Sequence, residues 1–160
     1  MLTHRLKPAE LVDKPPDGSA FARRIPAPTT TDFRLGEIVS IAANGQATRL
    51  TGSETTGFHL VVKDNSPGLP EGSFVDNPDG TWFARRPSTI DVIPVSGRRA
   101  ILTAQGTLTN AHIGAQRPLA TTADGITVVN LGGNGTAARI LQVVEGRVGD
   151  TNARVLVELA

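Results

Sequence analysis

The sequence contains no cysteine and few aromatic residues, and both shortages exclude functions. Without cysteine the chain cannot form a disulfide framework, a thiolate nucleophile or a cysteine-containing zinc or iron–sulfur site. The aromatic residues are one Trp, five Phe and no Tyr. Proteins that bind single-stranded nucleic acid usually stack bases on several aromatic side chains, so this composition argues against that function.

A strong net charge and long apolar runs are also missing. Lys and Arg number 16 and Asp and Glu number 15, so the formal net charge is +1. This balance creates no long-range field that would concentrate nucleic acid or anionic lipid. No run approaches the roughly 18 apolar residues of a membrane helix, and the first residues lack the apolar region of a signal peptide. We therefore expect a soluble, unexported protein, with neither nucleic acid nor membrane as a partner.

Proline and glycine are distributed unevenly, and the change divides the chain near residue 34. Residues 1–34 hold five of the 11 prolines but one of the 17 glycines. Because proline restricts the backbone and removes a hydrogen-bond donor, this segment is predicted to be an extended N-terminal arm, with at most one short helix near residues 9–13. Its apolar residues are too sparse to form a core, so the arm is either mobile or lies on another surface.

Residues 35–160 show the alternation of apolar and polar residues that is typical of antiparallel strands. Strands are expected within five ranges: 35–41, 57–63, 81–85, 126–131 and 154–159. In the second range Phe58, Leu60 and Val62 share one face, which predicts a half-buried strand. Since an open sheet would leave unpaired edges, the predicted fold is all-β: a small antiparallel β-barrel or sandwich of residues 35–160 that follows the arm.

Turn signals separate the expected strands. Four dipeptides favour the type I′ turns of hairpins: Asn44-Gly45, Asp79-Gly80, Asp124-Gly125 and Asn134-Gly135. Residues 131–136 are accordingly predicted to form a flexible hairpin tip. Residues 64–80 are rich in proline and glycine and predict a long surface loop, and loops of this length are often functional.

The titratable residues form no coherent catalytic set. The chain has three histidines: His4, His59 and His112. None has a metal-ligand spacing, and a triad of His59, Asp64 and Ser66 would lack the Gly-x-Ser-x-Gly motif. Residues 76–80 (Asp-Asn-Pro-Asp-Gly) lack the ligand spacing of a calcium loop and fit a turn better. We therefore expect a protein that is not an enzyme and that has no catalytic residue, metal site or cofactor.

The remaining signals favour binding to a partner. Arginine outnumbers lysine by thirteen to three, and its planar guanidinium group is common at protein interfaces. A GC-rich genome would produce the same bias. The arm and the loop of residues 64–80 are the predicted contact surfaces. The candidate partner-binding residues on them are Phe21, Arg23, Arg24, Ile25, Phe33, Leu69 and Phe74.

Five runs of residues share the pattern of one protein family. They are 36–41 (Gly-Glu-Ile-Val-Ser-Ile), 117–120 (Arg-Pro-Leu-Ala), 125–129 (Gly-Ile-Thr-Val-Val), 138–146 (Ala-Arg-Ile-Leu-Gln-Val-Val-Glu-Gly) and 153–159 (Ala-Arg-Val-Leu-Val-Glu-Leu). In these runs the sequence resembles the head decoration, or capsid cement, proteins of tailed bacteriophages, and the resemblance extends over half of the chain. The similarity is one of general pattern, without a diagnostic motif, and the arm has no counterpart that can be matched.

The resemblance implies a small β-barrel or sandwich, commonly a homotrimer, made in the host cytoplasm and located on the exterior of the capsid in the virion. It would bind the major capsid protein and tie neighbouring subunits together. From the chemistry of these segments, and not from the resemblance, we expect the arm to supply reach and residues 64–80 to supply part of the contact surface. One alternative is another virion component, such as a tail, spike or baseplate domain. The other is a small hydrolase or carbohydrate-binding domain that uses His59 or the acidic loop.

Overall fold

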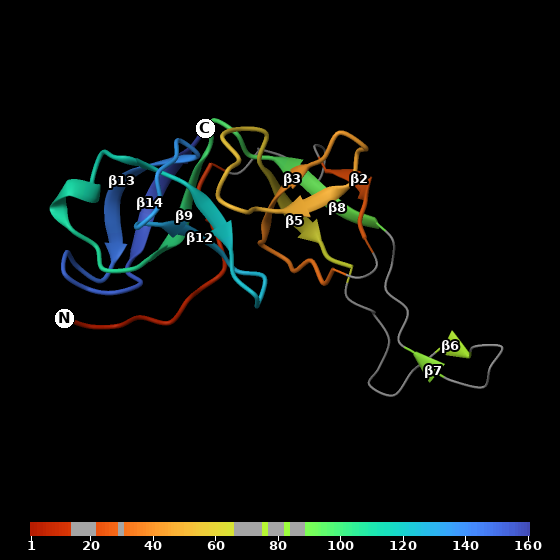
Figure 1. Cartoon of the computed structure of the whole chain (residues 1–160), viewed down its shortest axis with the longest axis horizontal. Helices are drawn as coiled ribbons and strands as arrows, with labels where there is room; N and C mark the ends of the chain where they lie inside the picture. Colours follow the sequence, from red (N-terminus) through yellow and green to blue (C-terminus); the bar gives the residue numbers. More distant parts are fainter. Residues whose placement is uncertain (14–21, 29–30, 66–74, 77–81, 84–88) are drawn as a thin grey trace.

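The computed structural model describes residues 1–13, 22–28, 31–65, 75–76, 82–83 and 89–160. Within these residues the fold is all-β, as the sequence predicts, and the only helix described is the single 3-10 turn η1 (Asn110–His112). Two sheets lie next to each other, one built largely from the C-terminal half of the chain and the other from its first half (Figure 1).

The larger sheet has seven strands and curls into a nearly closed barrel. Its strands are β1 (Glu10–Leu11), β9 (Arg99–Gln105), β10 (Gln116–Arg117), β11 (Leu119–Thr121), β12 (Thr127–Asn130), β13 (Ala138–Glu145) and β14 (Arg154–Leu159). The order is β10-β13-β14-β9-β12-β11, with β1 also beside β9. All neighbours are antiparallel except β9 and β12, which are parallel. The purely antiparallel barrel predicted from sequence is therefore wrong at this one pairing.

The second sheet has five antiparallel strands in the order β2-β8-β5-β3-β4. They are β2 (Arg23–Pro26), β3 (Ile38–Ile41), β4 (Ala47–Arg49), β5 (His59–Lys63) and β8 (Thr89–Pro94). A separate pair is formed by β6 (Val75–Asp76) and β7 (Trp82–Phe83). Strands thus occur within all five ranges that the alternation predicted, and they are shorter than the ranges in every case but β14.

The two sheets share a hydrophobic core. The barrel core of residues such as Leu102, Ile140 and Val155 also contains Ile38 of the second sheet and Phe58, which directly precedes strand β5 of that sheet. A second core, which includes Val61, lies within the smaller sheet. Strand β5 contributes to both, because Leu60 and Val62 pack against the barrel core while Val61 is buried on the other side. The half-buried strand predicted at 57–63 is therefore covered on both faces at its centre.

Two of the predicted hairpins are confirmed, but the predicted type I′ turns are wrong, because only the glycine of each dipeptide has a positive φ and Asn44 and Asp124 do not. Asn44-Gly45 joins β3 to β4 and Asp124-Gly125 joins β11 to β12, with φ of +82° at Gly45 and +77° at Gly125. Asp79-Gly80 lies outside the described residues, between β6 and β7. The fourth turn is wrong, because β12 and β13, which flank Asn134-Gly135, do not pair.

Instead of forming a free hairpin tip, residues 131–136 pack against Pro118. A Cβ atom on Gly133 would lie 2.7 Å from Cγ of Pro118, and one on Gly135 would lie 2.8 Å from its Cβ. Such distances leave no room for a side chain at either position, so these glycines allow close packing as well as a change of direction.

The described parts of the N-terminal arm lie on the rest of the chain. Strand β1 pairs with β9 of the barrel, and β2 pairs with β8 of the second sheet. The short helix that the sequence allowed near residues 9–13 is replaced by β1, whose backbone groups pair with a strand edge. Of the loop at residues 64–80, the structure describes only 64–65 and β6, and Asn65 is buried rather than on the surface.

Replacement of Phe58 tests whether the sheets fold as one body. Its side chain is fully buried in the barrel core although it precedes β5 of the second sheet. Phe58→Ala should lower the free energy of unfolding by about 3–5 kcal/mol because it leaves a cavity. Unfolding in urea, followed by circular dichroism, should remain a single transition. The control Leu35→Ala, at a 59% exposed site, should change little. Two separate transitions would contradict a shared core.

Candidate functional site

The first thirteen residues form an extended segment that lies along the barrel (Figure 1); we call residues 1–13 the N-terminal segment. Its backbone makes hydrogen bonds at both ends. The Thr151 N–H donates to the Leu2 carbonyl at 2.7 Å, and the His4 N–H donates to the Thr151 carbonyl at 2.9 Å. Further along, the Val12 N–H donates to the Arg99 carbonyl at 3.0 Å. The segment is therefore bound as an added strand.

Strand β9 explains where the segment binds. One edge of β9 pairs with β14 over residues 99–103. On the other edge β12 pairs only with residues 103–105, and β1 pairs with Ala100 and Ile101. The N-terminal segment thus covers the part of this edge that β12 leaves open, which removes unpaired backbone donors and acceptors from the surface.

A buried carboxylate holds the start of the segment. Asp150, between β13 and β14, has a side chain that is 1% exposed. One oxygen accepts a hydrogen bond from the Leu2 N–H at 2.9 Å. The other oxygen lies 3.0 Å from His4 Nε2 and accepts a hydrogen bond from the backbone N–H of Arg147 at 3.2 Å. The hydrogen bond to His4, followed by that from Leu2, lowers the pKa of Asp150 to about 2. Asp150 is therefore ionised when the segment is bound.

Two more buried polar side chains hold the middle of the segment. Thr103 Oγ1 accepts a hydrogen bond from the Lys7 N–H at 3.1 Å, and Thr103 is fully buried. Arg154 is 7% exposed, and its Nη1 donates to the Pro8 carbonyl at 3.1 Å. Its Nη2 lies 3.7 Å from Oε2 of Glu10. We call the surface made by Asp150, Thr103, Arg154 and the open edge of β9 the N-terminal groove.

Exposed ion pairs flank the groove. Lys7 Nζ lies 2.7 Å from Oε1 of Glu145, and Arg99 Nη2 lies 2.8 Å from Oδ1 of Asp13. Hydrogen bonds from these cations lower the pKa values of Glu145 and Asp13. Water and salt screen solvent-exposed pairs of this kind, so they add less to stability than the buried contacts do.

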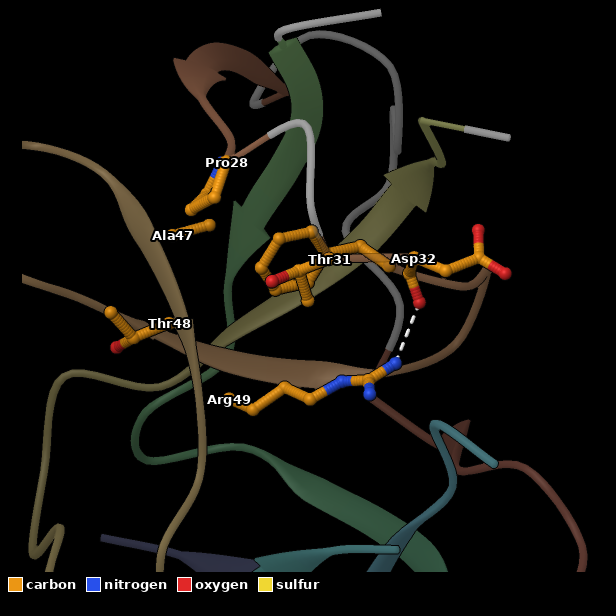
Figure 2. Close-up of a pocket in the computed structure, with 7 residues that line it drawn as sticks. Pro28, Thr31, Asp32, Ala47, Thr48 and Arg49 are labelled. Atoms are coloured by element: carbon orange, nitrogen blue, oxygen red, sulfur yellow. Dashed lines mark hydrogen bonds between the residues drawn. The ribbon is translucent and has the colours of Figure 1, made fainter. Parts of the chain in front are cut away.

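A second concave region lies in the smaller sheet (Figure 2). It is an open hollow of about 490 Å³, lined by Pro28, Thr31, Asp32, Phe33, Ala47, Thr48 and Arg49. Arg49 spans its floor: Nη2 donates to the Asp32 carbonyl at 2.6 Å, and Nε donates to Oε1 of Glu37 at 2.8 Å. The guanidinium group is thus already engaged by this chain's own oxygens.

Glu37 connects the hollow to the barrel. It is buried, and this burial raises its pKa above the usual value although Arg49 opposes the shift. A Cβ on Gly125, from the β11–β12 turn, would lie 3.2 Å from Oε2 of Glu37, and Thr127 Oγ1 accepts a hydrogen bond from the Ile38 N–H at 2.8 Å. This cluster therefore joins the two sheets, and we assign it a structural role.

The structure places the sequence-predicted residues in three different situations. Ile25 and Phe33 are buried in the second core, so their side chains are not on the surface. Arg23 and Arg24 are exposed on β2, where Arg24 Nε donates to Oδ1 of Asp91 at 3.1 Å. The other three lie outside the described residues: Phe21, Leu69 and Phe74.

The histidines also differ from the isolated groups that the sequence indicated. His4 contacts Asp150, a partner 146 residues away that no local motif indicates. His59 Nδ1 lies 2.9 Å from the Gly57 carbonyl, and burial lowers the pKa of His59. Among the described residues, no three His, Asp or Glu side chains are grouped closely enough to hold a metal ion. Ser66 of the possible triad lies outside those residues.

Comparison with known proteins finds no match: no family model, curated protein or solved structure corresponds to this chain. In the part of the chain that the structure describes, no helix has the length and apolar character needed to span a bilayer.

Substitution of Asp150 tests the role of the groove. Because its pKa is lowered from 3.8 to about 2, the stability that the carboxylate contributes is complete above pH 3.8 and is lost as the pH falls through about 2. Asp150→Asn imitates the protonated form at neutral pH, so it should release the N-terminal segment more often. Trypsin should then cut after Arg5 several-fold faster than in the unsubstituted protein. Asp124→Asn, in the exposed β11–β12 turn, is the control; equal rates in both variants would contradict this role.

Substitution of Glu37 tests the electrostatics of the sheet junction. Since the pKa of Glu37 is raised above 4.5, its contribution to stability is present below pH 4.5 and is lost as the pH rises through the raised value. The free energy of unfolding of the unsubstituted protein minus that of Glu37→Gln should therefore decrease from acid pH to neutral pH. Urea denaturation at a series of pH values measures this difference. An increase would show that attraction to Arg49 outweighs the cost of burial.

Proposed function

We propose that the protein is a structural component of a bacteriophage head, which binds the outer surface of the capsid and stabilises the shell by bridging neighbouring major capsid protein subunits. The observation that supports this proposal best is the position of the exposed apolar side chains. Met1, Leu2 and Val148 are 84%, 59% and 40% exposed. The backbone of Leu2 is bonded to Asp150 and Thr151, so all three lie at one end of the barrel.

This apolar end faces away from the second sheet, because the N-terminus lies at the opposite side of the barrel (Figure 1). Arg147, whose side chain is 74% exposed, follows β13 directly before Val148. Contiguous exposed apolar residues mark interaction sites more often than scattered ones do, and a combination with arginine is common at protein interfaces. The barrel therefore offers a surface suited to a protein partner.

Binding to the capsid shell would require contact surfaces on the protein and would not require a catalytic cleft. Copies that associate as a trimer would present three apolar ends at once, and simultaneous contacts of one assembly with several capsid subunits would raise the overall affinity through effective concentration. The exposed Arg23 and Arg24 on β2 offer a second contact on the other sheet. A chain with contacts at both ends can connect two neighbouring subunits.

Paired substitutions at matched exposures test this function. The double variant Leu2→Gln/Val148→Thr removes apolar surface from the barrel end. The control Leu35→Gln/Val12→Thr changes side chains of almost equal exposure elsewhere, 59% and 42%. Loss of about 1.4 kcal/mol of apolar burial corresponds to about tenfold weaker binding. Co-sedimentation with expanded capsids that lack this protein should show that loss for the first variant alone.

Two outcomes would overturn the proposal at different levels. Equal binding of both double variants would exclude the barrel end as the contact surface. No co-sedimentation of the unsubstituted protein would contradict capsid binding itself, and binding to purified tails instead would assign the protein to another part of the virion.

A further inference from the structure

The N-terminal segment is held mostly through its backbone and through polar contacts. Of residues 1–13, only Leu11 has a buried side chain, and Ala9 is the other residue that packs against the barrel core. Recognition through main-chain hydrogen bonds with few side-chain anchors is typical of β-strand addition. Release of the segment therefore exposes little apolar surface, and segments of this kind open at lower free energy than a core strand.

An empty groove is nevertheless unfavourable. Release removes hydrogen-bond partners from Asp150, Thr103 and Arg154, all of which are buried within the barrel when the segment is bound. Release exposes these groups to water, and a bond to water replaces only part of what each intramolecular hydrogen bond contributes to stability. The open edge of β9 also loses the strand that covers it. The segment can therefore leave without disrupting the hydrophobic core, and the unpaired edge and polar groups of the empty groove favour rebinding of any matching segment.

We propose that the N-terminal groove also accepts the N-terminal segment of a second copy of this chain, so that copies in close proximity exchange residues 1–13. The contacts in the groove are the same whichever copy supplies the segment, because each involves only residues 1–13 and the barrel. Beyond the segment, β2 pairs with β8 of the second sheet, and this pairing is the same in both arrangements. Exchange of this kind is a low-cost route to association.

Cysteine cross-linking provides the test. Because the chain has no native cysteine, only the introduced thiols can form a disulfide. Thr3 and Thr151 form an isolated parallel bridge, so they lie opposite each other when the segment is bound. Thr3→Cys and Thr151→Cys chains are purified separately, mixed at high concentration and oxidised. Exchange predicts a covalent heterodimer joining position 3 of one chain to position 151 of the other, several-fold above a control mixture of Thr3→Cys with Thr55→Cys, an exposed site elsewhere.

The double variant Thr3→Cys/Thr151→Cys shows whether the geometry permits the bond. At high dilution it should close within one chain. If it closes but the mixed single variants yield no more heterodimer than the control, exchange between copies is wrong. If it does not close, the docking on which the inference rests is wrong. The test contains no capsid, so either result is independent of the proposed function.

Discussion

The open edge of β9 is the constraint on which the rest of the structure depends. This central barrel strand pairs with β14 over residues 99–103 on one side, but β12 covers only residues 103–105 of the other. Backbone groups left unpaired there would expose an edge that favours aggregation. The N-terminal segment supplies the missing strand, and three buried polar side chains of the barrel meet its backbone. The start of the chain is therefore a component of the barrel.

This arrangement also determines which side chains the molecule exposes at its ends. Because Leu2 is fixed beside Asp150 and Thr151, the apolar side chains of Met1 and Leu2 are added to Val148 at one end of the barrel. The shared core and the hydrogen bond between Ile38 and Thr127 join the barrel to the second sheet. Surfaces at both ends of the molecule are thus held by one connected body, as a protein that bridges subunits requires.

Local signals predicted the fold class and part of its connectivity. Alternation located strands within five ranges, and Asn44-Gly45 and Asp124-Gly125 marked hairpins, because both signals act over a few adjacent residues. Asn134-Gly135 carries the same local signal, but packing against Pro118 and the pairing of β12 with β9 determine its structure. Long-range packing overrode turn preference there.

Local sequence signals of this kind could not predict the N-terminal groove. Alternation places Arg154 opposite the core-facing Val155, and a residue on that face is expected to meet solvent. It is buried because residues from the start of the chain, 146 positions away, cover it. For the same reason the sparse apolar residues of the arm were interpreted as contacts for a partner. Ile25 and Phe33 instead pack into the second hydrophobic core. The surface that they contact therefore belongs to this chain and not to a partner.

The central claim is that the N-terminal segment is an integral strand of the barrel, and native-state hydrogen exchange tests it most directly. The amide hydrogens of His4, Val12 and Thr151, which bond across the groove, should exchange far more slowly than those of an unstructured peptide. Exchange at unstructured rates for these three amides, while β9 and β14 stay protected, would show that the barrel stands without its first residues and would contradict the account.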